Sequence, residues 1–265
     1  MINRTRMITI LFLAGVLSVF MVKTGEGVPG GPKIDILRDM RAIEFGQIDY
    51  DTPADPYFAY IRGTIPILVS APHGTKHYRT KEARWKAENA YTASLAIELG
   101  KLTGAHVLYV KNKAGEDPNN DEGTQYKEFL KKVVNENNIR FVLDFHGSDS
   151  HRPYKIDVGI MNNAVTLCSC PTYRGLIEHT FSSFQPRVFN QHFSAHSKGT
   201  VTYFAKNGLG IEAAQIEINA NYRIVESKST GFKADPRNIL DLVERLRSLI
   251  VAINEKITLD GAKSG

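Results

Sequence analysis

Two histidines, each followed by glycine and each closing an apolar run, are the residues of this 265-residue chain best suited to chemistry. They are His73 and His146, and a third apolar run carries Glu217. Neutral imidazole is a good zinc ligand, and a glycine after it would let a substrate approach closely. Two nitrogen ligands and a nearby carboxylate are most of what a hydrolytic zinc site needs. The sequence therefore predicts a metal centre built on these residues.

The three apolar runs are typical of buried strands, which we expect at 65–71, 140–145 and 212–219. Open α/β sheets bind their ligands at the carboxyl ends of the strands. Two imidazoles carried there by different strands can meet at one metal ion. The strands would thus bring together side chains that lie far apart in the sequence.

The elements between these strands complete an alternating pattern. Helical spacing of apolar residues predicts helices over about 82–102, ended by Gly104, and 122–137, with a strand at 105–110 between them. The second half predicts a strand at 155–161, a helix at 173–184, hairpin and loop at 186–210, and a last helix opening at Asp235-Pro236. This pattern predicts a single three-layer α/β/α domain with a mixed, largely parallel sheet.

The N-terminus has the character of an export signal. Basic residues within 3–6 precede an uninterrupted apolar run, 7–22. We expect residues 1–27 to be a signal peptide or membrane anchor, 28–60 a lead-in that is irregular or holds an edge strand, and 61–256 the folded domain. The protein is then secreted or associated with the cell envelope, with membrane attachment through 7–22 as one form.

Composition excludes several classes of function. The net charge is +5, but the basic residues are spread along the chain and form no block of the kind that binds nucleic acid. The two cysteines, Cys168 and Cys170, are too close in sequence for a disulfide framework. No Gly-x-Ser-x-Gly motif indicates a serine nucleophile. A small-molecule or peptide-like substrate is the expected partner.

Five motifs in order resemble the N-formylglutamate amidohydrolase family. They are Ser70-Ala71-Pro72-His73-Gly74, Glu88-Asn89-Ala90-Tyr91-Thr92, Asp117-Pro118-Asn119-Asn120, Leu143-Asp144-Phe145-His146-Gly147 and Gln215-Ile216-Glu217-Ile218-Asn219. The resemblance covers residues 60–222. It implies the phosphorylase/hydrolase-like fold that this family shares with zinc carboxypeptidases, succinylglutamate desuccinylase and aspartoacylase.

The resemblance also implies a set of metal ligands. His73 and His146 match the two metal-binding histidines of the family, and Glu88 is the expected third ligand to Zn²⁺. Asn89 could occupy the same place, although an amide oxygen is a poor zinc ligand; Glu82 and Asp117 are further alternatives. With water in the fourth position, this is the open pattern of catalytic zinc.

Two further carboxylates have expected roles. Glu217 lies between apolar neighbours, and because a buried carboxylate has a raised pKa it suits proton transfer near neutral pH. It matches the general base of the family; the alternative is an alternating strand on which Glu217 faces water. Asp144, two residues before His146, could orient an imidazole or could bond to backbone amides instead.

The chain departs from the family in the Asp117-Pro118-Asn119-Asn120 motif. Related enzymes carry Asn-Arg here, and their arginine binds a substrate carboxylate. This chain has Asn119 and Asn120, so either Arg152 or Lys111 supplies the charge, or the substrate is not an acylated acidic amino acid. An arginine or lysine could also stabilise the oxyanion that forms during the reaction.

These observations predict an exported zinc-dependent hydrolase that cleaves a C–N amide bond in an N-acyl amino acid or peptide-like substrate. Two alternatives remain at this point. One is a zinc carboxypeptidase or cell-wall peptide amidase on the same fold. The other is a non-catalytic exported protein that binds a small ligand.

Overall fold

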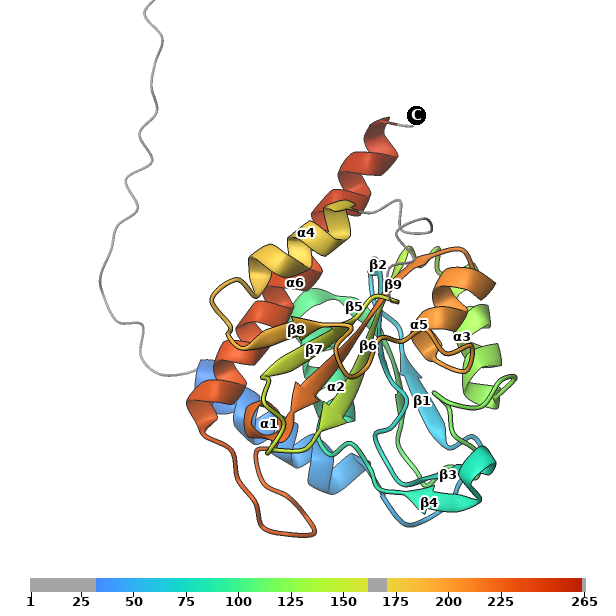
Figure 1. The fold of residues 1–265 in the computed structure, drawn as a ribbon, viewed down its shortest axis with the longest axis vertical. Coiled ribbons are helices and arrows are strands. Elements are labelled where there is room, and N and C mark those ends of the chain that lie inside the picture. Colours follow the sequence, from blue (N-terminus) through green and yellow to red (C-terminus); the bar gives the residue numbers. More distant parts are fainter. Residues whose placement is uncertain (1–31, 162–170, 264–265) are drawn as a thin grey trace, which may run out of the picture. The chain divides into compact units, whose positions relative to one another are not determined.

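The computed structural model describes residues 32–161 and 171–263, which build a seven-stranded sheet, a small hairpin and the helices around them (Figure 1). The strands are β1 (Phe58–Ile61), β2 (Ile65–Ala71), β3 (His77–Arg79), β4 (Arg84–Lys86), β5 (Ala105–Val110), β6 (Phe141–Ser148), β7 (Ile156–Gly159), β8 (Arg187–Phe189) and β9 (Glu212–Asn219). The helices are α1 (Pro32–Gln47), α2 (Thr92–Thr103), α3 (Gln125–Glu136), α4 (Pro171–Thr180), α5 (Val201–Tyr203) and α6 (Pro236–Lys263).

The large sheet has the strand order β1-β5-β2-β6-β9-β7-β8. The four central strands β5, β2, β6 and β9 are parallel. The strands at both sides run the other way, because β1 pairs antiparallel with β5 and β7 pairs antiparallel with β9. The predicted mixed, largely parallel sheet is confirmed, and the carboxyl ends of β2, β6 and β9 share one edge.

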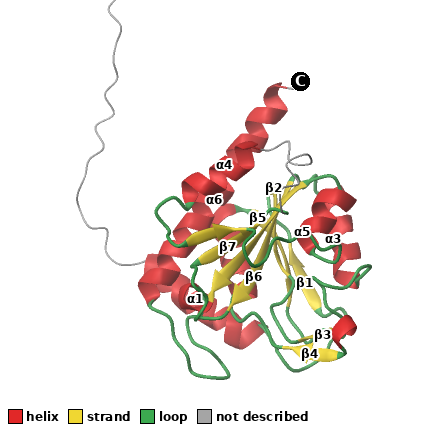
Figure 2. Ribbon diagram, viewed as in Figure 1, coloured by secondary structure: helices red, strands yellow, loops and turns green. Residues whose placement is uncertain are grey.

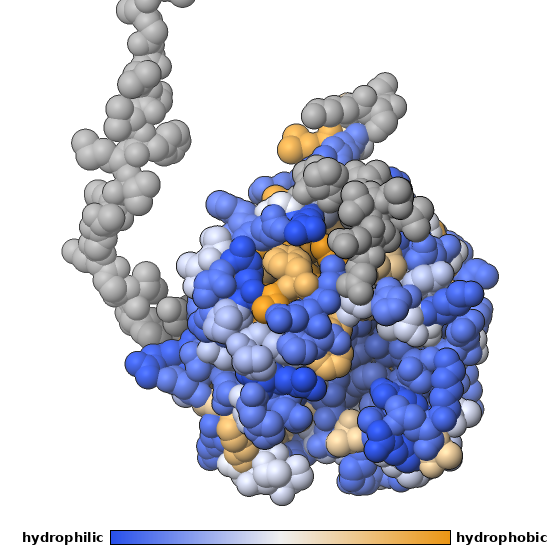
Figure 3. All heavy atoms as spheres, viewed as in Figure 1, coloured by the Kyte–Doolittle hydropathy of each residue, from blue (hydrophilic) through white to orange (hydrophobic). Residues whose placement is uncertain are grey.

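Helices cover both faces of this sheet (Figure 2). On one face α1, α2, α4 and α6 enclose the larger apolar core, and on the other α3 and α5 enclose the smaller one. Successive strand residues point to opposite faces, so Phe145 and Ile216 enter the larger core while His146 and Glu217 point toward the α3 side. The predicted three-layer arrangement is confirmed. The surface seen in Figure 3 is mainly hydrophilic, with apolar side chains in small patches.

Two segments differ from their predictions. The helix predicted over 82–102 begins only at Thr92, because residues 77–86 pair as the hairpin β3–β4 with His77 opposite Lys86. The lead-in at 28–60 contains the edge strand but also helix α1, whose Met40 and Ile43 are buried in the larger core. Cross-strand pairing thus outweighs helical periodicity in 77–86, and burial of apolar side chains accompanies a helix in the lead-in that the sequence did not predict.

The predicted export segment and both cysteines lie outside the described residues. Among the helices within 32–161 and 171–263, none is long and apolar enough to cross a membrane.

Gly104 ends helix α2 as predicted, and it does so in the left-handed conformation with φ +79°. Its N–H donates to Gly100 O, and a Cβ at this position would lie 2.6 Å from Thr64 Oγ1. We expect Gly104→Ala to lower the free energy of unfolding by about 1–2 kcal/mol, because the left-handed conformation is strained for alanine. Urea denaturation of the purified protein measures this loss.

Gly46 provides the matched control, since it lies within α1 and a Cβ there would meet no atom within 4 Å. Gly46→Ala should raise the free energy of unfolding by about 0.5–1 kcal/mol, because alanine loses less conformational entropy in a helix. A Gly104→Ala protein as stable as the wild type would contradict the assigned strain.

Candidate metal centre

A cavity of about 520 Å³ opens at the carboxyl edge of the sheet. His73, His146 and Glu217 all line it, although 144 residues separate the first from the last. The hairpin β3–β4 contributes Arg79 and Lys86 to its wall. The three sequence motifs that predicted chemistry are therefore brought to one site.

The strand register arranges the polar side chains beneath this cavity in two rows. In one row Ser70 of β2 pairs with Asp144 of β6, which pairs with Gln215 of β9. In the next row His146 pairs with Glu217 of β9. Paired residues on parallel strands point to the same face, so the sheet itself sets Glu217 beside His146. Glu217 is only 5% exposed, and the alternative that it faces water is wrong.

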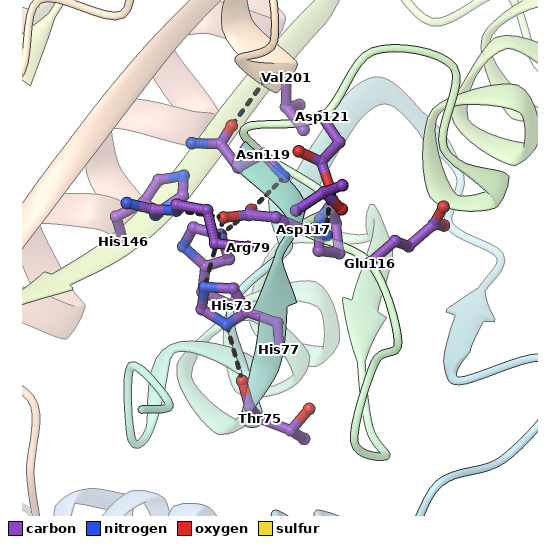
Figure 4. A network of polar contacts seen from close by, with 12 residues as sticks. His73, Thr75, His77, Arg79, Glu116, Asp117, Asn119, Asp121, His146 and Val201 are labelled. Carbon is purple, nitrogen blue, oxygen red and sulfur yellow. Dashed lines mark hydrogen bonds and ion pairs between the residues drawn. The ribbon is translucent and has the colours of Figure 1, made fainter. Parts of the chain in front are cut away.

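Three buried side chains have the spacing of a metal-binding group: His73, which lines the cavity, and His77 and Asp117, which both contact His73. One ligand atom from each lies within 4.8 Å of the others. His73 Nε2 is 2.7 Å from Asp117 Oδ1, and His77 Nε2 is 3.6 Å from Asp117 Oδ2. The two imidazoles stack in parallel with their centroids 3.9 Å apart. Figure 4 shows these side chains converging, with His146 beside them.

This group suits a divalent metal of the zinc type. Two imidazole nitrogens and a carboxylate oxygen form a donor set that zinc prefers. His77 Nε2 is buried and has no hydrogen-bond partner, which is costly for a polar atom unless something binds there. The residues present therefore fit a bound metal.

His77 and Arg79 are site residues that the sequence analysis did not identify. His77 follows His73 by four residues, but in a segment without a recognisable element this spacing gave no signal. Arg79 Nε donates to Asp117 Oδ2 at 2.7 Å, and its Nη1 donates to Glu82 Oε1 at 2.9 Å. Asp117, one of the alternatives for the third ligand, lies at the centre of these contacts.

Neighbouring charges and burial shift the pKa of Asp117 in opposite directions. Burial by itself would raise its pKa, but the neighbouring His73, His77 and Arg79 hold the pKa of this carboxyl well below its usual range. Burial lowers the pKa of His73, and the neighbouring His77 lowers it further, against the effect of Asp117. His73 is thus favoured in the neutral form that binds metals.

Asp144 contacts His146 in the way that an orienting carboxylate would. Its Oδ2 is 3.1 Å from His146 Nε2, while its Oδ1 accepts a hydrogen bond from Ser70 Oγ at 2.9 Å. Burial by itself would lower the pKa of His146, but Asp144 outweighs this effect and the pKa is raised. The ring of His146 meets the ring of His73 edge-on at a centroid distance of 4.9 Å.

Glu217 has the environment of a proton-transfer group. Burial raises its pKa to about 7, although the nearby charges of His146 and Arg223 oppose the rise. Gln215 Nε2 donates to its Oε1 at 3.2 Å. The site therefore contains two carboxylates with different environments, Asp117 buried among hydrogen-bond donors and Glu217 desolvated in the cavity lining.

The other predicted site residues divide into two groups. Asn89, Asn119 and Arg152 line the cavity, whereas Lys111 and Asn120 are not among its lining residues. Glu88 lines a separate hollow together with Lys76 and Lys228.

The backbone explains why Glu88 is not brought to the histidines. Asn89 N donates to His73 O at 2.8 Å, and this bond holds the segment so that Asn89 faces the cavity. Its neighbour Glu88 consequently faces the other way. A metal role for Glu88 is not supported by this placement, and among the described residues the group with metal-binding spacing joins Asp117 and His77 to His73 and does not include the predicted ligand His146.

The two glycines that follow the histidines serve packing. A Cβ on Gly147 would lie 2.4 Å from Nη2 of Arg223, a buried arginine that donates to Ala90 O, Ser148 O and Ile218 O. A Cβ on Gly74 would lie 2.4 Å from Val110 O. Both glycines thus allow close approach of the protein itself, and Gly147 also lines the cavity, where the predicted approach of a substrate stays a prediction.

Comparison of the chain with solved structures finds several of similar fold. The N-formylglutamate amidohydrolase of Ralstonia eutropha JMP134 matches 74% of this chain and 96% of its own, with a TM-score of 0.51 and 14% identity. A bacteriophage poly-gamma-glutamate hydrolase matches 77% of this chain and 91% of its own, with a TM-score of 0.48 and 18% identity. A metallo-carboxypeptidase from Burkholderia cenocepacia matches 76% of this chain and 65% of its own, with a TM-score of 0.42 and 12% identity.

Comparison of the sequence with family models and with curated proteins finds no match. The structural similarity to N-formylglutamate amidohydrolase nevertheless shows that the chain shares its fold. The resemblance expected from the motifs is confirmed at the level of the fold.

The raised pKa of Glu217 makes the stability of the metal-free protein depend on pH. Folded Glu217 keeps its proton up to about pH 7, against an ordinary value of 4.5. Its contribution therefore favours folding below pH 4.5 and is lost as the pH rises through 7. We expect Glu217→Gln to gain about 3 kcal/mol in unfolding free energy relative to the wild type between pH 4.5 and pH 8.

Urea denaturation across this pH range, with a chelator present, measures the difference. Glu82→Gln is a suitable control, because Glu82 is an exposed carboxylate whose pKa neighbouring arginines lower to about 2. Its stability relative to the wild type should stay constant between pH 4.5 and 8. Parallel curves for Glu217→Gln and the wild type would show that Glu217 does not hold its proton in this range.

Proposed function

We propose that this protein is a zinc-dependent hydrolase that cleaves the C–N amide bond of an anionic N-acyl amino acid or peptide-like substrate. One observation carries the proposal: the buried group of His73, His77 and Asp117 reaches the cavity through His73, and the same cavity is lined by Glu217, whose pKa is raised to about 7. The N-formylglutamate amidohydrolase that shares the fold supports this reaction class.

In this proposal His73, His77 and Asp117 hold the metal. Zinc bound there supplies Lewis-acid polarisation of the substrate carbonyl and activation of the attacking water. Arg79 keeps the Asp117 carboxylate ionised and fixed in direction through its 2.7 Å hydrogen bond. His146, held by Asp144, lines the cavity edge-on to His73.

Glu217 moves the proton. A carboxylate with a pKa near the working pH can both accept and donate a proton without a large energetic penalty. It would accept the proton of the attacking water and deliver it to the leaving amine. Its place in register with His146 keeps it within the cavity and away from bulk water.

The cations of the cavity support an anionic substrate. Arg79, Lys86 and Arg152 line the wall, and the Arg152 guanidinium lies 5.5 Å from the centroid of the Phe193 ring. Arg79 is already bonded to Asp117, and Lys86 Nζ lies 3.7 Å from Glu82 Oε2, which leaves Arg152 as the main candidate for a substrate carboxylate. Arginine binds carboxylates through paired hydrogen bonds, which makes Arg152 the better candidate.

Export belongs to the same proposal and is supported by the apolar run 7–22 after a basic start. The substrate would then be met outside the cytoplasm. Peptide-like material of the cell envelope fits this location as well as an N-acyl amino acid does.

Metal analysis of the purified protein tests the centre. We expect about one zinc per chain after reconstitution, and its loss in His73→Ala and in Asp117→Asn, because each variant removes a ligand. His77→Ala should release zinc more readily than His146→Ala. Absence of zinc from the reconstituted wild type would overturn the proposal.

Glu217→Gln separates a catalyst from a binding protein. We expect this variant to keep its zinc and to lose turnover by about 10²–10⁴-fold on N-acyl amino acids or acidic peptides, because it lacks the general base. A non-catalytic binding protein would show no hydrolysis in the wild type and unchanged ligand affinity in the variant.

Arg152→Met tests recognition of the substrate carboxylate. A hydrogen bond between charged groups is worth about 1.5–3 kcal/mol, so kcat/KM for an anionic substrate should fall about 10–100-fold, mainly through KM. Lys111→Met is the matched control, because Lys111 was the alternative cation and does not line the cavity. Its kcat/KM should remain within about twofold of the wild type, and equal effects of the two substitutions would exclude the assignment to Arg152.

A further inference from the structure

Lys127 is a buried cation that neither the metal group nor the proton transfer uses. It lies in the first turn of α3 and is 1% exposed. Its Nζ donates to two main-chain carbonyls, Pro118 O and Asp121 O, both at 2.6 Å. Lysine is almost never fully buried unless its charge is compensated, so these contacts call for an explanation.

The two carbonyls belong to the loop that carries Asp117. Within this loop Asp121 N and Asn120 N donate to Asp117 O at 3.0 and 3.2 Å, and Asn119 N donates to Asp117 Oδ1 at 3.0 Å. The loop is thus a tight turn wrapped around Asp117. Figure 4 shows Asp117 at its centre, pointing toward the histidines.

We propose that Lys127 is a positioning residue that fixes the loop 117–121 and thereby holds the Asp117 carboxylate between His73 and His77. The proposal rests on the metal centre proposed above. Lys127 touches neither the cavity nor the three candidate ligands through its hydrogen bonds, and it acts through the backbone of the loop.

Two other contacts of the loop differ in kind from those of Lys127. Thr80 Oγ1 of the hairpin donates to Asp121 Oδ2, and Val201 N donates to Asn119 Oδ1. Both contacts attach the loop to cavity walls through side chains. Lys127 instead holds the backbone at two points, before and after Asn119, from the rigid helix α3.

Electrostatics agree with this role. Burial lowers the pKa of Lys127 to about 8, and the nearby carboxylates Asp117, Asp144, Asp121 and Glu116 oppose that shift. A buried ammonium near four carboxylates offsets part of their repulsion, and it donates hydrogen bonds to two carbonyls of the loop. A neutral side chain of similar volume would provide neither.

Hydrogen exchange of the loop amides, followed by NMR in the protein with a chelator present, tests the positioning directly. In Lys127→Met we expect the amides of Asn119, Asn120 and Asp121 to exchange at least about 10-fold faster than in the wild type. We also expect the zinc dissociation constant, measured by chelator competition, to rise about 10–100-fold, as found when groups that orient metal ligands are removed. Lys127→Arg, which keeps the charge and donors, should recover part of both effects.

Thr124→Ala is the matched control for a merely structural effect. It removes the N-cap of α3, in which Thr124 Oγ1 accepts from Lys127 N, and leaves the contacts of Lys127 Nζ in place. We expect it to lower the melting temperature while the loop amides and the zinc dissociation constant change by less than about threefold. If Lys127→Met does not fold, Lys127→Gln is measured with the same expectations.

The proposal would be overturned if the loop amides of Lys127→Met exchanged at wild-type rates. It would also be overturned if Thr124→Ala accelerated their exchange as much as Lys127→Met does. Failure of the proposed function is a separate result: the reconstituted wild type would bind no zinc, while the loop amides would still show whether Lys127 holds the turn.

Discussion

The buried carboxylate of Asp117 is the group on which the geometry of this site depends. An ionised carboxylate without partners would be very costly in the interior, so it must be surrounded by donors or cations. Here the donors come from His73, from Arg79 of the hairpin and from the loop of Asp117 itself. One charge thereby ties together the end of β2, the hairpin and the loop before α3. The nitrogen and oxygen atoms that it gathers are those a divalent metal prefers, so the contacts that make burial tolerable also prepare a metal site.

The sheet gives Glu217 a different environment from Asp117, and the difference separates their chemistry. Asp117 is surrounded by donors that keep it ionised, whereas Glu217 is buried with fewer partners and its pKa rises to about 7. Enzymes often contain two titratable groups whose surroundings shift their pKa values in opposite directions. One group can then transfer a proton while the other stays charged. The register of β6 and β9 places Glu217 directly beside His146 in the lining of the cavity, which also includes His73, the partner of Asp117.

The glycines next to the two histidines each allow another part of the protein to pack closely behind the site. Gly147 leaves room for the buried Arg223, whose guanidinium joins carbonyls from three separate segments, and Gly74 lies against the end of β5. The histidines therefore sit on backbone that is held by contacts behind the site. Such support fixes imidazole directions in a way that flexible loops could not.

The sequence by itself determined the central strands, the alternation with helices and the residues at the strand ends, because the two-residue and 3.6-residue periods of apolar side chains are local properties. It thereby located His73, His146 and Glu217 at one sheet edge. The tertiary structure decided which further residues reach them. Residues 77–86 become a hairpin instead of the start of a helix, which brings His77 and Arg79 to Asp117 and leaves Glu88 facing a separate hollow. That outcome depends on hydrogen bonds between segments distant in sequence, and no local pattern of residues contains them.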